Sequence, residues 1–284
     1  MDDLLALFPQ YRPDKDVILY HYCPAESFKA IIENKTLRFC DLYHMNDMAE
    51  LSHGNLLFET LLKEAEMPED IKDTIRNIHK ELRDRIVMLS MSFSKDGDQL
   101  SQWRGYANDG KGFCIGFNAC ELDNLPVNIL KVEYDVEKQC ALIWDAIGKI
   151  IDKIRDGLTE KNLLFIAELI ELFALMKNES FAEEKEYRLV SALGIDMDKG
   201  TGVFNDFIHS DKYNNFFCGD IAFRLVDNIP VPYVDIYYNR DNRKPIVEVI
   251  IGPKNMSTEF DIDLFLRTNN IYDVKISKSL SSYR

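Results

Sequence analysis

The segment IVMLSMSFS at residues 86–94 restricts the fold more than any other stretch of the chain. Its second half alternates strictly, with Leu89, Met91 and Phe93 separated by serines. Successive side chains of a strand point to opposite faces, so this pattern predicts a strand with one apolar face and one face lined by Ser90, Ser92 and Ser94.

Other segments are predicted from the same kinds of pattern. Strands are expected at residues 17–22, 112–117, 184–192, 246–252 and 273–277; helices are expected at 24–39, at 54–85 with a break at Pro68, around Trp103 and Tyr106, and within 136–178. Helices are inserted between strands without regular βαβ alternation, which favours one α+β domain over residues 1–284 with a mixed or antiparallel sheet core. The 136–178 stretch is a candidate helical subdomain or lid.

The composition excludes several classes of protein. Forty-eight acidic residues against 34 basic ones give a formal charge of -14, which argues against a broad nucleic-acid surface, because phosphate contacts need clustered Lys and Arg. No apolar run approaches the length of a membrane span. The six cysteines form no CxxC pair, so we expect reduced thiols, no metal site and a cytoplasmic protein. The oligomeric state stays open.

Residues 105–111, GYANDGK, have the spacing of a phosphate-binding loop. Such a loop needs Ser or Thr after the lysine, a strand before it and a helix after it. Here Gly112 follows Lys111, a helical turn precedes the loop and a strand follows it. We therefore interpret the glycines as a structural corner.

Two polar positions lie near the N-terminus. His21 is expected on the same strand face as apolar residues, where a histidine is usually a hydrogen-bonded core residue. Asn46 and Asp47 lie in a polar connection, where they could cap the following helix or contact a ligand. No pair of residues in this connection has the spacing of a metalloenzyme.

The segment FAEEKEYRLV at residues 181–190 contains a second polar cluster. A regular strand would place Glu184, Glu186 and Arg188 on one face, about 6.6 Å apart in succession. The cluster is either a surface ion-pair ladder of little energetic weight or a group of carboxylates with shifted pKa values beside a cleft. The spacing alone does not decide between them.

These segments together resemble a known family. LYHYCPAESFKAIIENKTLRF, HMNDMAEL, LSMSFSKDGDQLSQWRGYANDGKGFCIGF, FAEEKEYRLV, VEVIIGP and ISKSLSSYR, in this order, are similar to a bacterial domain-of-unknown-function family, number twenty-nine seventy-one. The resemblance extends over nearly the whole chain. The family implies no function.

A more distant resemblance concerns ADP-ribosyltransferase-like folds. These open with a strand that carries His or Arg and then a helix, continue with a Ser- or Tyr-bearing strand and a short helix, and end with a strand containing E-x-E. His21 and Tyr22, then Ser92 with Trp103 and Tyr106, then Glu184 and Glu186 occur here in that order. Unlike in that pattern, a further strand at 246–252 and a tail follow the E-x-E segment.

This resemblance implies NAD as a substrate and no metal. Cleavage of the nicotinamide–ribose bond passes through an oxocarbenium-like centre, which a carboxylate can stabilise. The resemblance gives this role to Glu186, with Glu184 assisting the acceptor and His21 bonding a ribose hydroxyl. Ser92 would brace the site, Arg188 would keep Glu186 ionised or bind a phosphate oxygen, and Tyr22, Trp103 or Tyr106 would stack on a ring of the ligand.

Three interpretations therefore remain. The first is an NAD-using transferase or glycohydrolase, as an effector of bacterial conflict or phage defence, whose His21, Ser92 and Glu186 meet at one pocket. The second is a non-catalytic module for a ligand or partner, with Glu186 held in ion pairs by Arg188 and Lys185 and no cavity. The third is a metal-dependent nuclease using Asp47, Glu50 and the Glu184/Glu186 pair, which the acidic charge disfavours.

Overall fold

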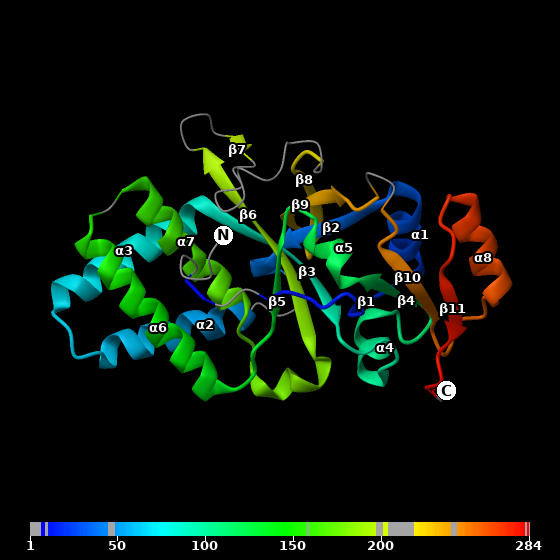
Figure 1. The fold of residues 1–284 in the computed structure, drawn as a ribbon, viewed down its shortest axis with the longest axis horizontal. Helices are drawn as coiled ribbons and strands as arrows, with labels where there is room; N and C mark the ends of the chain where they lie inside the picture. Colours follow the sequence, from blue (N-terminus) through cyan, green and yellow to red (C-terminus); the bar gives the residue numbers. More distant parts are fainter. Residues whose placement is uncertain are drawn as a thin grey trace.

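The described strands of the chain form one mixed sheet (Figure 1). The computed structural model describes residues 7–8, 11–44, 49–157, 159–196, 201–203, 219–239, 243–281 and 283. The strands are β1 (Ile18–Cys23), β2 (Thr36–Asp41), β3 (Ile86–Ser94), β4 (Phe113–Asn118), β5 (Asn128–Lys131), β6 (Glu186–Asp196), β7 (Thr201–Val203), β8 (Ala222–Val226), β9 (Ile229–Tyr237), β10 (Ile246–Ile251) and β11 (Lys275–Lys278).

The strand order is β11-β10-β4-β1-β3-β2-β9-β8. Outside this order, β6 pairs with β3 and also with β5 and β7. The β10–β11 pair is parallel and the other described strand pairs are antiparallel. The expected α+β class with a mixed, mostly antiparallel sheet is therefore confirmed.

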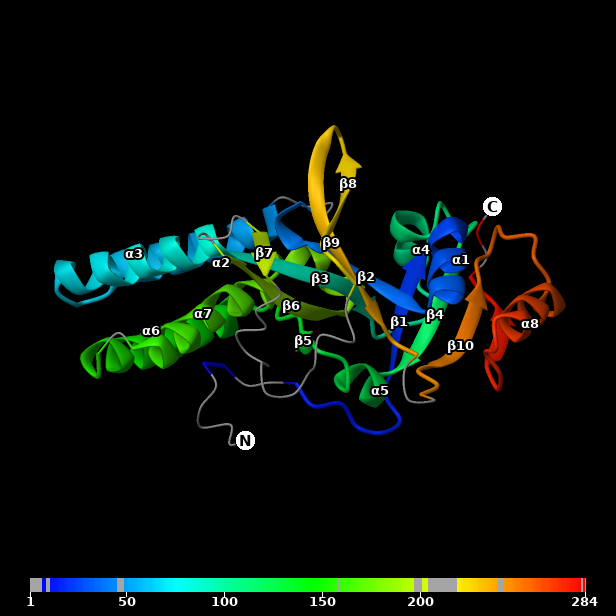
Figure 2. The same cartoon turned by 90° about the horizontal axis from the view of Figure 1, so that it is seen from above.

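Most helices lie at the two ends of the sheet (Figures 1 and 2). In chain order they are α1 (Ala25–Asn34), the 3-10 turn η2 (Leu42–His44), α2 (Ala49–Glu64), α3 (Glu69–Arg85), α4 (Leu100–Tyr106), α5 (Ala119–Asp123), α6 (Val136–Arg155), α7 (Glu160–Ala174), the 3-10 turn η3 (Glu179–Glu184) and α8 (Glu259–Thr268). Helices α2, α3, α6 and α7 form an elongated group at one end, whereas α1, α4 and α8 lie toward the other, and α5 lies between the two groups (Figures 1 and 2).

The two faces of β3 and β6 differ as the alternation in 86–94 predicts. Leu89, Met91 and Phe93 are buried with Tyr187 and Leu189 in the main core of the sheet. The opposite face begins with apolar residues under the helices, which are Ile86, Met88, Val190 and Ala192. Farther along β3 and β6 the same face becomes polar, because Ser92 pairs with Arg188 and Ser94 with Glu186. One sheet face thus carries a helical core at one end and a polar floor at the other.

The sheet opens beside this polar floor. One edge of β3 pairs with β1 at Ser94 and with β2 at Ser90 and Leu89. Within the described part of the chain, neither strand pairs with residues 91–93 between these contacts. β1 and β2 therefore diverge from β3, which leaves space between them.

Most expected elements are confirmed, and two boundaries are corrected. Helix α1 ends at Asn34 because Lys35 adopts a left-handed conformation (φ 57°), and Thr36–Asp41 then forms β2 rather than the end of the predicted helix. Strand β6 begins at Glu186, whereas Glu184 lies in η3 and Lys185 is left-handed (φ 45°). Glu184 and Glu186 are therefore not neighbours on one strand face.

The glycine-rich stretch after α4 is a structural corner. The main-chain N–H of Gly110 donates to the carbonyl of Trp103, and that of Gly112 donates to Ala107. A Cβ on Gly112 would lie 2.2 Å from the carbonyl oxygen of Cys23. The order of helix, loop and strand confirms the rejection of a phosphate-binding loop.

Candidate functional site

A cavity of about 520 Å³ lies on the polar face of the sheet, where β1 and β2 diverge from β3. Its volume is within the range of small-molecule sites. The lining residues of β2 alternate along the strand, whereas consecutive residues of β1 and β3 border the cavity where these strands diverge. The strand residues are Tyr20, His21 and Tyr22 of β1, Thr36, Arg38 and Cys40 of β2, Ser90, Met91, Ser92, Phe93 and Ser94 of β3, and Glu186 of β6. The walls come from α1, from Tyr106 of α4 and from the segment around η3.

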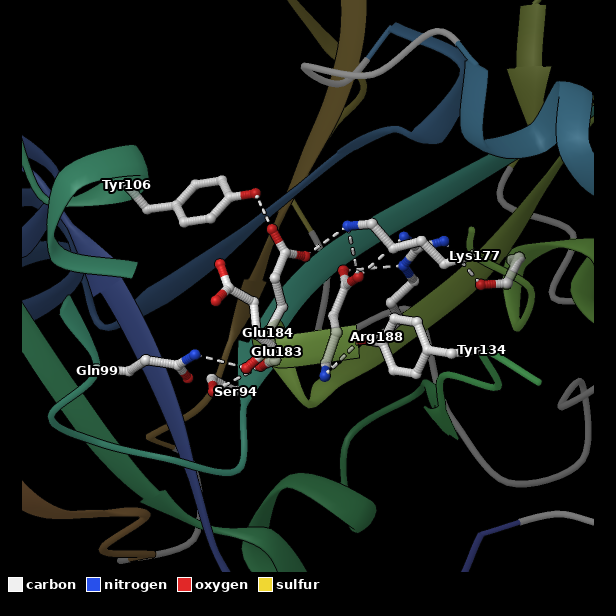
Figure 3. A network of polar contacts seen from close by, with 10 residues as sticks. Ser94, Gln99, Tyr106, Tyr134, Lys177, Glu183, Glu184 and Arg188 are labelled. Atoms are coloured by element: carbon white, nitrogen blue, oxygen red, sulfur yellow. Dashed lines mark hydrogen bonds and ion pairs between the residues drawn. The ribbon is translucent and has the colours of Figure 1, made fainter. Parts of the chain in front are cut away.

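A network of four charged side chains lies at one wall, and three of them, Lys177, Glu184 and Glu186, line the cavity (Figure 3). Lys177 follows α7, and its Nζ donates to Glu184 Oε2 at 2.6 Å and to Glu186 Oε2 at 3.0 Å. Arg188 donates from Nε to Glu186 Oε1 at 2.9 Å and from Nη2 to Oε2 at 3.0 Å. Lys177 therefore donates to two carboxylates, and Glu186 accepts hydrogen bonds from two cations, Lys177 and Arg188.

The Glu186 carboxylate is ionised and accepts hydrogen bonds at both oxygens. Burial alone would raise its pKa, but Arg188 and Lys177, together with a hydrogen bond from Ser92, lower it to about 2. Both carboxylate oxygens already accept from cations. Glu186 is thus ionised at neutral pH with little acceptor capacity left for a ligand.

Glu184 is the more available of the two carboxylates. Its Oε1 accepts from the hydroxyl of Tyr106 at 2.9 Å, and Oε2 accepts from Lys177. A carboxylate has about four acceptor positions. Both Glu184 and Tyr106 line the cavity, and burial, followed by the charge of Glu184, raises the pKa of Tyr106 so that it stays a donor.

His21 approaches the cavity from β1. Its Nδ1 lies 3.0 Å from the carbonyl oxygen of Ser92, which only accepts, so Nδ1 carries the proton. Burial lowers the pKa of His21, which keeps the ring neutral at pH 7. Nε2 is then an acceptor. The ring also packs 5.6 Å from Phe93, as expected for a hydrogen-bonded core histidine. The residue has both a structural contact and access to the cavity.

Tyr22 of β1 and Trp103 of α4 belong mainly to the structural corner around α4, beside the cavity. Tyr22 lines the cavity, but its hydroxyl donates to the Asp96 carbonyl and accepts from the Gln99 N–H. Trp103 is fully buried, packs edge-on against Tyr22, and donates from Nε1 to Asp98 at 2.7 Å. Trp103 does not line the cavity, so its ring is not placed to stack on a ligand there.

The structure brings five of the predicted residues together with Tyr22, namely His21, Ser92, Tyr106, Glu184 and Glu186. Arg188 lies behind Glu186 and is buried. Asn46 and Asp47 lie outside the described residues. Lys185, expected beside Glu186, instead pairs with Asp96 at 2.7 Å.

Sequence reasoning missed three cations at the cavity, which are Lys177, Arg38 and Arg224. Lys177 follows a long apolar helix and has no local motif. Arg38 was assigned to a helix that in fact ends before β2, and no strand was predicted around Arg224. The alternation of polar and apolar residues in TLRFCD is the local signal that places Arg38 on a strand.

Comparison with known proteins supports one part of the family resemblance. Residues 102–189, less than half of the chain, match the sequence model of the family described as Protein of unknown function (DUF2971). No curated protein and no solved structure matches the chain. The resemblance to ADP-ribosyltransferase-like folds therefore receives no support from these comparisons.

Three further observations concern the described residues only. None of their helices is long and apolar enough to cross a membrane. They contain no group of three or more His, Cys, Asp or Glu side chains arranged to hold a metal ion. The cysteines among them, which are Cys23, Cys40, Cys114, Cys120 and Cys140, are free thiols.

Proposed function

We propose that this chain is an NAD-using transferase or glycohydrolase that binds the dinucleotide in the cavity and cleaves its nicotinamide–ribose bond. The observation that carries the proposal is the convergence of His21, Ser92, Tyr106, Glu184 and Glu186 on one cavity of suitable volume. These residues come from separate segments of the chain, so their meeting depends on the fold. An activity of this kind would suit an effector of bacterial conflict or phage defence.

The chemistry requires a stabilised positive centre. The C1′–N bond breaks, its electron pair leaves with neutral nicotinamide, and C1′ becomes oxocarbenium-like. Water or an acceptor nucleophile then adds to C1′ and loses a proton. A carboxylate held ionised beside C1′ stabilises the developing charge.

We assign that charge-stabilising role to Glu184 rather than Glu186. Glu184 keeps acceptor capacity beside its bonds to Tyr106 and Lys177. Glu186 already accepts three hydrogen bonds from Arg188 and Lys177, and instead it fixes Lys177, which in turn orients Glu184. Nε2 of neutral His21 would accept a hydrogen bond from a ribose hydroxyl, since Nδ1 already donates to the carbonyl oxygen of Ser92.

The test is nicotinamide release from NAD by the purified full chain. Glu184→Gln is expected to reduce release about 100- to 1,000-fold, because it removes the charge that faces C1′. Glu183→Gln is the matched control, since Glu183 is the exposed neighbour and does not line the cavity. Absence of release by the wild type, together with no NAD-dependent thermal shift, would reject the proposal.

A second candidate is a binding module without chemistry. The engagement of Glu186 by Arg188 and Lys177 favours it, because an ion-pair network of this kind can be purely structural. This candidate predicts a ligand-dependent thermal shift with no nicotinamide release from the wild type.

A further inference from the structure

The cavity wall holds three cations, and two of them are already neutralised. Lys177 lies between Glu184 and Glu186. Arg38 donates from Nε and Nη2 to the two oxygens of Asp235, both at 2.9 Å, and its guanidinium lies 3.9 Å from the ring centroid of Tyr233. Both cations are therefore matched by carboxylates that line the same cavity.

Arg224 is different. Within the described part of the chain, no hydrogen bond or ion pair engages its guanidinium, although the residue lines the cavity. Each lining carboxylate is already paired, Glu184 and Glu186 with Lys177 and Asp235 with Arg38. The charge of Arg224 thus has no counterion in the cavity wall, in a chain whose net charge is -14.

The strand register explains why Arg224 faces the cavity. Tyr233 of β9 lies opposite Cys40 of β2 and Ala222 of β8, so these three share one sheet face. Arg224 is two residues beyond Ala222, and Arg38 is two residues before Cys40. Side chains two residues apart on a strand share a face. The two arginines therefore project on the cavity side at the β2–β9–β8 end, whereas Glu184 and Glu186 belong to the η3–β6 wall.

We propose that Arg224 forms an anion subsite of the cavity, which binds a pyrophosphate group of a nucleotide ligand. Guanidinium groups bind phosphate oxygens through paired, charge-assisted hydrogen bonds. The inference rests on the proposed function in that NAD carries a pyrophosphate between its two ribose groups. The phosphates would lie at the arginine end and the nicotinamide ribose at the Glu184 end.

Calorimetric titration of the full chain with inorganic pyrophosphate and with ADP-ribose tests the subsite. Arg224→Gln is expected to weaken binding of both probes about 10- to 100-fold, as for loss of a charged hydrogen-bonding group. Arg224→Lys should give an intermediate loss, because it keeps the charge without the forked donors. Arg155→Gln is the matched control and should bind as the wild type, because Arg155 is an exposed residue of α6 outside the cavity.

The outcomes separate this inference from the proposed function. Arg224-dependent binding of pyrophosphate without nicotinamide release would support the subsite and reject the catalytic proposal. Nicotinamide release with an unchanged KM for NAD in Arg224→Gln would overturn the subsite and leave the catalytic proposal standing. Failure of the wild type to bind either probe would also overturn it. Circular dichroism of each variant verifies folding.

Discussion

Lys177 determines how the two glutamates of the site differ. It donates to both carboxylates, and Arg188 adds two further hydrogen bonds to Glu186, so Glu186 accepts more bonds from cations than Glu184 does. The two glutamates of the E-x-E motif therefore differ in role: Glu186 holds Lys177 and Arg188 in place, and Glu184 can face a ligand. This division of roles depends on single contacts and not on the motif.

The pH dependence of stability should report on Glu186. Its pKa is about 2 in the folded chain against an ordinary 4.5, so its ionised form stabilises the fold above pH 4.5, and this contribution is lost as pH falls toward 2. The shift corresponds to stability on the order of 3 kcal/mol. Urea unfolding of the wild type between pH 7 and pH 3 should show this decline.

Glu186→Gln should remove the part of the acid-induced loss of stability that comes from protonation of Glu186. It should also destabilise the chain at pH 7 by about 3–5 kcal/mol, because Arg188 and Lys177 would lose a buried partner. Glu183→Gln should keep the wild-type profile, since its side chain is exposed. Equal profiles for wild type and Glu186→Gln would contradict the ion-pair network described above.

At the scale of elements, two lysines in left-handed conformations mark where a helical segment ends and a strand begins. Lys35 separates α1 from β2, and Lys185 separates η3 from β6. Each change of direction brings a cavity residue into place, Thr36 in the first case and Glu186 in the second. Non-glycine residues adopt this conformation infrequently, which is why composition did not reveal either boundary.

The corner after α4 offers a matched pair of glycine substitutions. Gly112→Ala should destabilise the chain by about 1–3 kcal/mol or more, because the new Cβ would meet the main-chain carbonyl of Cys23. Gly105→Ala should be neutral or stabilising by up to about 1 kcal/mol, since it lies in α4 with nothing within 4 Å of a Cβ.

Thermal or urea unfolding of the two variants gives the comparison. A strong loss of stability for Gly105→Ala together with tolerance of Gly112→Ala would contradict the close approach of Gly112 to the Cys23 carbonyl. The pair also tests the resemblance of residues 105–111 to a phosphate-binding loop, in which Gly105 would be the first required glycine.

At the scale of the whole molecule, β3 and β6 join the two main cores. Leu89 and Leu189 lie in the core of the sheet, whereas Met88 and Val190 lie in the core under the helices. The same two strands therefore contribute alternate residues to both cores. The stretch 136–178 supplies α6 and α7 to the helical core, and Lys177 at its end enters the cavity.

The two ends of the molecule should consequently unfold together. In Trp144→Phe, the remaining Trp103 reports by fluorescence on the corner beside the cavity, while far-ultraviolet circular dichroism reports mainly on the helices. Coincident urea transitions are expected, because neither core is complete without β3 and β6. Separate transitions would show that the helical end is an independent unit.

Much of the secondary structure could be predicted because the signals are local. The alternation in 86–94 matches β3 from Ile86 to Ser94, and Pro68 separates α2 from α3 as expected. Strand β2 was missed because the helical pattern of α1 continues into it without a glycine or proline. Strands β5, β7, β8 and β9 were also not predicted.

The sequence by itself determined the α+β class, the two-faced strand β3 and the candidates His21, Ser92, Tyr106, Glu184 and Glu186, because periodicity and residue chemistry are local properties. Only the tertiary structure decided that these side chains meet in one cavity, that Lys177 and Arg188 saturate Glu186, and that Arg224 stays unneutralised among the described residues. Such contacts join residues far apart in the chain. Their partners depend on strand register and on the opening between β1 and β2, which no local pattern contains.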